Sequence, residues 1–157
     1  MYIHAIMSND KTSLGKTLVA DTRLAAECCI GLNVRLAARR ITRFFDARLA
    51  ETGFSLAQFG LLIHIASARD DTIGSLAERS GLDQSTLSRN LRPLEAAGLI
   101  EIVTVEADLR RRAVWLTEQG ASRLENAMTI WRAAHDTLSK LINPEELRQL
   151  ATMTEAI

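Results

Sequence analysis

The stretch from Thr72 to Thr117 constrains the fold more than any other part of the sequence. Its residues follow the order helix, tight turn, helix, strand, loop and strand. Residues 73–91, at its centre, have the shape of a helix-turn-helix, in which the second helix is free to enter a DNA major groove. The pattern therefore predicts double-stranded DNA as the ligand.

The second helix of this stretch has two different faces. Leu87, Leu91 and Leu94 recur at i, i+4 and i+7, and this apolar stripe predicts packing against a core. Another face carries short hydroxyls and long guanidiniums, which bond phosphates and base edges. Asp83 stands where an N-cap belongs, and the helix N-terminus also favours a phosphate. The alternative is an ordinary amphipathic helix with a solvated polar face. The predicted DNA-binding residues here are Gln84, Ser85, Thr86, Ser88, Arg89 and Arg92.

The segment after this helix predicts a β-hairpin wing. Gly98 ends the helix, and residues 99–105 and 112–117 are apolar and β-branched, as paired strands are. The tip between them, residues 106–111, carries adjacent arginines, which suit a minor groove or a phosphate ridge. The alternative is a solvated turn whose arginines serve solubility. The wing adds Asp108, Arg110, Arg111 and Arg112 to the predicted DNA-binding residues.

Together these motifs resemble the MarR family of bacterial transcriptional regulators. The resemblance extends over roughly residues 24–142 with motifs, and over the last helix by position only. The segments that carry it are residues 76–89, residues 94–100 and the pattern Asp108-x-Arg110…Val114-x-Leu116-Thr117-x-x-Gly120.

The resemblance implies a dimer whose recognition helices enter the major groove and whose wing arginines reach the minor groove. Asp108 matches the family's aspartate that orients this arginine, and Arg110 matches the arginine. Arg111 and Arg112 lie beside them but are not fixed by the pattern. The resemblance also implies an effector site between the dimer helices and the winged helix. Residues near it would include Arg39, Phe44, Phe59, Leu62 and Trp131.

Composition sets limits on the class of protein. The 157 residues, 47% of them hydrophobic, suffice for one unit with a sizeable core. Lys+Arg and Asp+Glu both total 19, so any positive patch must be local, on the recognition helix and the wing. The sequence has no apolar run of membrane-spanning length, and its start lacks the pattern of a signal peptide. We therefore expect a cytoplasmic protein without a membrane partner.

The expected fold is mostly α with a small β-hairpin wing, a winged helix-turn-helix flanked by dimerisation helices. Residues 1–20 predict a mobile arm, in which Met1 or Met7 is the natural start, and residues 21–157 a single unit. Within that unit, residues 54–117 form the DNA-binding region, and residues 21–53 and 118–157 the flanking helices, including one long helix from Thr22 to Glu51. The apolar surplus of the flanking helices predicts a homodimer. The alternative is that they pack only on their own winged helix.

The two cysteines, Cys28 and Cys29, are adjacent and lie in a helical pattern. No further cysteine stands at metal-ligand spacing, so no zinc site is expected. They are either small buried hydrophobes or the thiols of an oxidant sensor. The sequence contains no Gly-rich phosphate loop, H-E-x-x-H motif or nucleophile elbow, so we expect no enzyme, no catalytic residue and no cofactor.

The sequence thus predicts a homodimeric, sequence-specific DNA-binding transcriptional regulator, a repressor released by a small-molecule effector. Two alternatives stay open: a thiol-based oxidant sensor that uses Cys28 or Cys29, and a winged-helix scaffold for protein interactions that does not bind DNA.

Overall fold

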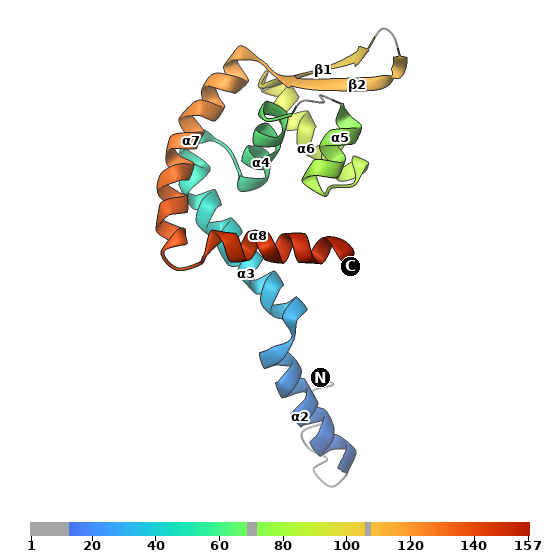
Figure 1. Ribbon diagram of the computed structural model, residues 1–157, viewed down its shortest axis with the longest axis vertical. Coiled ribbons are helices and arrows are strands. Elements are labelled where there is room, and N and C mark those ends of the chain that lie inside the picture. Colours follow the sequence, from blue (N-terminus) through green and yellow to red (C-terminus); the bar gives the residue numbers. More distant parts are fainter. Residues whose placement is uncertain (1–12, 69–71, 106–107) are drawn as a thin grey trace. The chain divides into compact units, whose positions relative to one another are not determined.

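Figure 1 shows the computed structural model, which describes residues 13–68, 72–105 and 108–157. The chain divides into two compact units, residues 1–43 and 44–157. The elements, in chain order, are α2 (Ser13–Cys28), α3 (Ile30–Leu49), η1 (Ala50–Thr52), α4 (Leu56–Ala66), α5 (Ile73–Ser80), α6 (Gln84–Ala96), β1 (Ile100–Val105), β2 (Asp108–Leu116), α7 (Glu118–Ser139), α8 (Pro144–Met153) and η2 (Thr154–Ala156).

The first unit is helical, and it corrects the expected arm over residues 1–20. Residues 13–20 already belong to α2, while residues 1–12 lie outside the described residues. Leu14, Leu18 and Ala25 are good helix formers at a helical spacing. Gly15 and the polar residues between them obscure this spacing in the sequence.

The single helix expected from Thr22 to Glu51 is interrupted at Cys29, where α2 ends and α3 begins. The Cys29 N–H still donates to the Ala25 carbonyl at 3.0 Å, and the Cys29 carbonyl accepts from the Asn33 N–H at 3.0 Å. Nδ2 of Asn33 donates to the Glu27 carbonyl at 3.1 Å, in the last turn of α2, where carbonyls lose helical partners. The chain therefore keeps a helical path through the break.

The second unit holds the hydrophobic core, which is built around α4. This helix contacts α5, α7 and β2, and α6 in turn contacts α5 and β1. Phe59 and Leu62 of α4 are fully buried, as are Leu76 of α5 and Leu87 of α6. Full burial of a side chain of this size stabilises the fold by about 1.5–3 kcal/mol, so these few contacts fix α6 against the rest of the unit.

Polar contacts join the end of α3 to α4, and η1 to α7. The side chain of Asp46 accepts a hydrogen bond from the Leu56 N–H at 2.7 Å, at the start of α4. Nη2 of Arg123, in α7, donates to the Thr52 carbonyl at 2.6 Å, and its guanidinium lies 4.9 Å from the centre of the Phe54 ring. One arginine therefore satisfies a carbonyl at the end of η1 and packs on a buried aromatic ring.

The wing is an antiparallel hairpin of β1 and β2 (Figure 1). Ile100 pairs with Leu116, and the register shifts between Thr104 and Val105. We expected residues 106–111 to form the tip, but β2 begins at Asp108, so residues 108–111 are strand. The irregular register accounts for the difference. From Thr104 to Val105 the strand β1 advances by one residue, while the paired position on β2 moves from Arg112 to Asp108, so three extra residues of β2 lie between the two pairs and pairing continues further towards the tip.

Gly120 lies where α7 passes closest to the wing. A Cβ atom there would lie 1.9 Å from the Leu99 carbonyl oxygen. The same junction is held by Thr117, whose N–H donates to the Leu99 carbonyl at 3.1 Å and whose hydroxyl donates to the Gly98 carbonyl at 2.7 Å. The Thr117 hydroxyl also accepts from the Gly120 N–H at 3.0 Å and caps α7. The end of α6, the base of the wing and the start of α7 therefore meet at one point.

Among the described residues, no single helix is long and apolar enough to cross a membrane; only α3 with η1 and α4, taken together, reach that length and composition. The architecture is otherwise that expected: mostly helical, with one two-stranded hairpin. The predicted fold class, a winged helix-turn-helix with flanking helices, is confirmed.

Gly120→Ala should destabilise the fold by about 2 kcal/mol or more, because the new methyl group meets backbone rather than a movable side chain. The measurement is the free energy of unfolding in urea. The matched control is Gly60→Ala, also within a helix and with nothing within 4 Å of the new Cβ. That change should raise stability by about 0.5–1 kcal/mol. Equal stabilities for the two variants would show that α7 can move away from Leu99.

Candidate nucleic-acid interface

Helix α6 presents one face to solvent and buries the other, as predicted. Leu87, Leu91 and Leu94 are at most 2% exposed, and they anchor the helix in the core. Thr86 is half-buried, and the other predicted residues of the helix are exposed. The exposed side chains are Gln84, Ser85, Ser88, Arg89 and Arg92.

The turn before α6 is shaped by Gly81, which caps α5 in the left-handed conformation with a φ of 63°. Its N–H donates to carbonyls of the last turn of α5, as in a glycine C-cap. Asp83 then begins α6 as its N-cap, in the extended conformation. This short connection leaves the first turn of α6 at the surface of the unit.

Three side chains in the first two turns of α6 are linked by hydrogen bonds. The Asp83 carboxylate accepts from the Thr86 N–H at 2.8 Å and from the Thr86 hydroxyl at 2.7 Å. Nη2 of Arg89 donates to the same hydroxyl oxygen at 3.2 Å. The sequence identified Asp83 as the cap but missed its link to Arg89, for which the i, i+3 spacing of the three residues was the available signal.

The charge of Asp83 changes what the helix N-terminus can bind. The Thr86 N–H, followed by the Thr86 hydroxyl, lowers the pKa of Asp83 below its ordinary value of 3.8, and the nearby Arg89 charge acts in the same direction. The carboxylate thus remains ionised at neutral pH and already occupies the anion position that we expected a phosphate to take.

Arg92 lies one turn further along α6 and is exposed, and no hydrogen bond joins it to another described residue. Pro93 follows it inside the helix, which continues to Ala96. The two arginines of this face therefore differ, because Arg89 is held by a neighbour and Arg92 is not.

Of the predicted DNA-binding residues in the wing, one has a described side chain. Arg112 is exposed on β2, where it pairs with Thr104 of β1. The backbones of Asp108, Arg110 and Arg111 belong to β2, but their side chains lie outside the described residues. At the base of the hairpin, Nε1 of Trp115 donates to the Glu101 carboxylate at 3.1 Å, a cross-strand pair that the sequence did not indicate.

The cysteines lie in the first unit, at the interruption between α2 and α3. Cys28 is exposed and Cys29 is half-buried, and both are free thiols. The expectation of two buried small hydrophobes is therefore wrong for Cys28. Among the described residues, no group of three His, Cys, Asp or Glu side chains is placed to hold a metal ion.

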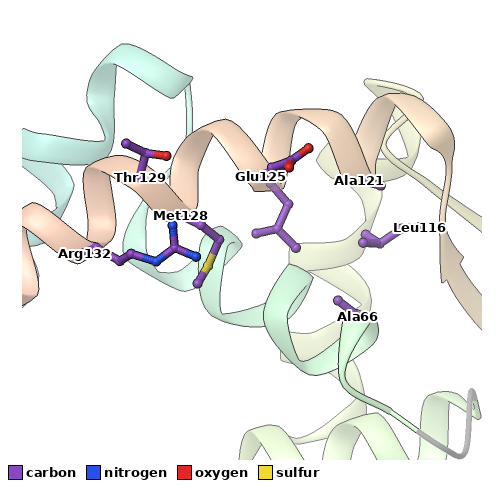
Figure 2. A pocket seen from close by; sticks show the side chains of 8 residues that line it. Ala66, Leu116, Ala121, Glu125, Met128, Thr129 and Arg132 are labelled. Atoms are coloured by element: carbon purple, nitrogen blue, oxygen red, sulfur yellow. The ribbon is translucent and has the colours of Figure 1, made fainter.

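The second unit also contains an open cavity of about 510 Å³ between α4, the end of β2 and one face of α7 (Figure 2). The Met128 and Arg132 side chains project from α7 at one end of this cavity, and Ala66 of α4 and Leu116 lie at the other. None of the residues named from the family resemblance lines it; Phe59 and Leu62 are instead buried in the core. Sequence periodicity could not reveal this space, because it depends on how α4, β2 and α7 meet. The lining residues are Ala66, Leu116, Ala121, Leu124, Glu125, Met128, Thr129 and Arg132.

The core-anchored α6, its exposed polar face and the adjoining hairpin define the class of winged helix-turn-helix proteins. Residues 52–111 match the sequence model of the MarR family. This segment therefore carries the MarR-family winged helix, and the resemblance predicted from the sequence is confirmed.

Solved structures agree with this assignment. The chain is 29% identical to the Mycobacterium tuberculosis transcriptional regulator MosR, solved in complex with DNA, with a TM-score of 0.75 over 82% of this chain and 96% of that one. The Staphylococcus aureus MepR–DNA complex, at 23% identity, has the same fold, with a TM-score of 0.72 over 83% and 99% of the two chains. The Escherichia coli MarR variant C80S, solved with operator DNA, also has this fold. It is 23% identical to this chain, with a TM-score of 0.72 over 85% of this chain and 96% of that one. The search of curated proteins gave no significant match.

The acid titration of Asp83 should reveal its bonds to Thr86. Because its folded-state pKa is lowered, the stabilisation from its charge is complete above pH 3.8 and is lost as the pH falls through the folded-state value. A carboxyl-carbon NMR titration should therefore give a midpoint below 3.8 in the wild type. Thr86→Val keeps the N–H donor but removes the hydroxyl, so its midpoint should lie closer to 3.8. A wild-type midpoint at or above that value would contradict the bonds described.

Proposed function

We propose that the chain is a homodimeric, sequence-specific DNA-binding transcriptional regulator without catalytic activity. The observation that supports this most is the divided surface of α6, whose leucines are buried while Arg89, Arg92 and several hydroxyls face solvent. Long guanidiniums and short hydroxyls on one exposed helix face suit phosphates and base edges in a major groove. A winged-helix scaffold for protein interactions is less well supported, because the exposed face of α6 is polar and charged and carries no aromatic side chain to anchor a protein partner.

The wing is the second part of the proposed interface. Arg112 is exposed, and a charge there suits a phosphate ridge. By the family resemblance, Arg110 reaches the minor groove and Asp108 orients it, with Arg111 beside them. The structures of MosR, MepR and MarR solved with DNA support double-stranded DNA as the ligand of this fold. We therefore propose that the wing adds affinity for DNA that depends little on the DNA sequence.

Arg89→Ala should reduce binding to a preferred duplex much more than binding to a scrambled duplex of the same composition. The preferred duplex is obtained by selection from a random pool with the wild-type protein. An arginine bidentate to guanine contributes about 1–3 kcal/mol of discrimination, so the affinity ratio should fall about tenfold or more. Both affinities are measured at one salt concentration, since phosphate contacts depend strongly on salt.

The matched control for this experiment is Arg92→Ala, which removes the same charge from the same face. Equal losses on both duplexes for Arg89→Ala would assign Arg89 to phosphates, and base reading would then fall to Gln84, Ser85 or Ser88. If the selection recovered no preferred sequence, sequence-specific recognition itself would be refuted.

Dimerisation is proposed from exposed apolar side chains in both units. In the first unit, Leu24, Ile30 and Leu32 are exposed. In the second, no residue of α8 is buried, and its apolar side chains include Leu147 and Leu150. Apolar surface of this extent on flanking helices is typical of a subunit interface.

Sedimentation at micromolar concentration should give twice the chain mass of 17.3 kDa. Leu147→Lys with Leu150→Lys should shift the protein towards monomer, because charges would be buried at the interface. Thr152→Lys adds a charge on the same exposed helix and is the control. A wild-type monomer that retains full affinity for DNA would rule out the dimer.

Repression and release by a small molecule complete the proposal, supported by the family resemblance and by the cavity on α7. Its lining combines apolar side chains with Glu125, Thr129 and Arg132, which suits a small, partly apolar molecule with polar groups. The oxidant-sensing alternative has only the exposed Cys28 in its favour. Release of the selected duplex by a small polar molecule would support the effector proposal, whereas release by mild peroxide would support the oxidant-sensing alternative.

A further inference from the structure

We infer that Thr86, held by Asp83, is a positioning residue that fixes the guanidinium of Arg89 for base recognition. The inference rests on the proposed DNA-binding function, and it concerns how one side chain of α6 is oriented before DNA is bound. The hydrogen-bonded chain of Asp83, Thr86 and Arg89 carries it.

The chemistry of the three groups permits only one direction for these hydrogen bonds. An arginine can only donate, and an ionised carboxylate can only accept. The Thr86 hydroxyl must therefore give its single proton to Asp83, at 2.7 Å, and offer a lone pair to Arg89, at 3.2 Å. Asp83 thus sets the orientation of the hydroxyl, and the hydroxyl sets the position of the guanidinium.

The geometry leaves Arg89 able to bind a base. Only Nη2 is engaged by Thr86, and the guanidinium has further N–H donors in its planar fork. A bidentate contact with guanine requires two of these donors in a fixed direction. Arg89 is exposed, so a held guanidinium loses less conformational freedom on binding than a free one.

Arg92 provides the internal comparison. It lies on the same exposed face, but no hydrogen bond joins it to a described residue, Thr86 included. Removal of the Thr86 hydroxyl should therefore affect recognition through Arg89 and leave the contribution of Arg92 as it is. This difference separates positioning from a general effect on the helix.

The test uses Thr86→Val, which has nearly the same shape as threonine and retains the N–H that Asp83 caps. Affinities are measured for the selected duplex and for the scrambled duplex at about 0.15 M salt. Thr86→Val should lower the ratio of the two affinities about three- to tenfold, while Thr86→Ser, which restores a hydroxyl, should recover most of it. In the Arg89→Ala background Thr86→Val should have no further effect, and in the Arg92→Ala background it should have its full effect.

Several outcomes would overturn the inference. A ratio unchanged by Thr86→Val, or a loss of equal size in the Arg89→Ala background, would show that Thr86 does not act through Arg89. If Thr86→Val does not fold by circular dichroism, Asp83→Asn takes its place, since asparagine caps a helix as well as aspartate but removes the charge. An unchanged ratio for Asp83→Asn would equally refute it. A wild-type protein without preference between the duplexes would refute the proposed function and, with it, this inference.

Discussion

The close approach of Gly120 to the Leu99 carbonyl is the constraint on which the winged helix depends. Leu99 lies between the end of α6 and the start of β1, while Gly120 lies in the first turn of α7. No side chain fits between them, so three elements share one fixed point. Thr117 strengthens it with three hydrogen bonds to the same few residues. A rigid junction of this kind lets a recognition helix and a wing keep a constant spacing, as a DNA groove requires.

Packing in the core also fixes which face of α6 is exposed. Leu87, Leu91 and Leu94 prevent rotation of the helix about its axis, because any rotation would bring apolar surface into water. What remains adjustable is the orientation of single side chains, and there the structure differs between Arg89 and Arg92. Core packing therefore fixes the orientation of the helix, and a hydrogen bond fixes the position of one guanidinium, that of Arg89.

The sequence predicted those features that local chemistry determines. The cap Asp83 and the leucine stripe of α6 were readable, because each depends on neighbours within four residues. The interruption at Cys29 and the extension of β2 to Asp108 were not, since they depend on a side-chain bond and on strand register. The cavity on α7 depends on three elements distant in sequence, so no periodicity could reveal it.

The division of α6 into two faces has a consequence for how such regulators diverge. Substitutions at exposed helix positions usually change stability by about 0.5 kcal/mol or less, whereas changes in a buried leucine cost several times as much. Under the proposed function, a duplicated copy of this chain would therefore be able to acquire a new binding sequence through exposed residues such as Gln84, Ser85 or Ser88 while its core stayed the same. Arg89 is the exception on that face, because its replacement would leave the Thr86 hydroxyl without its guanidinium donor.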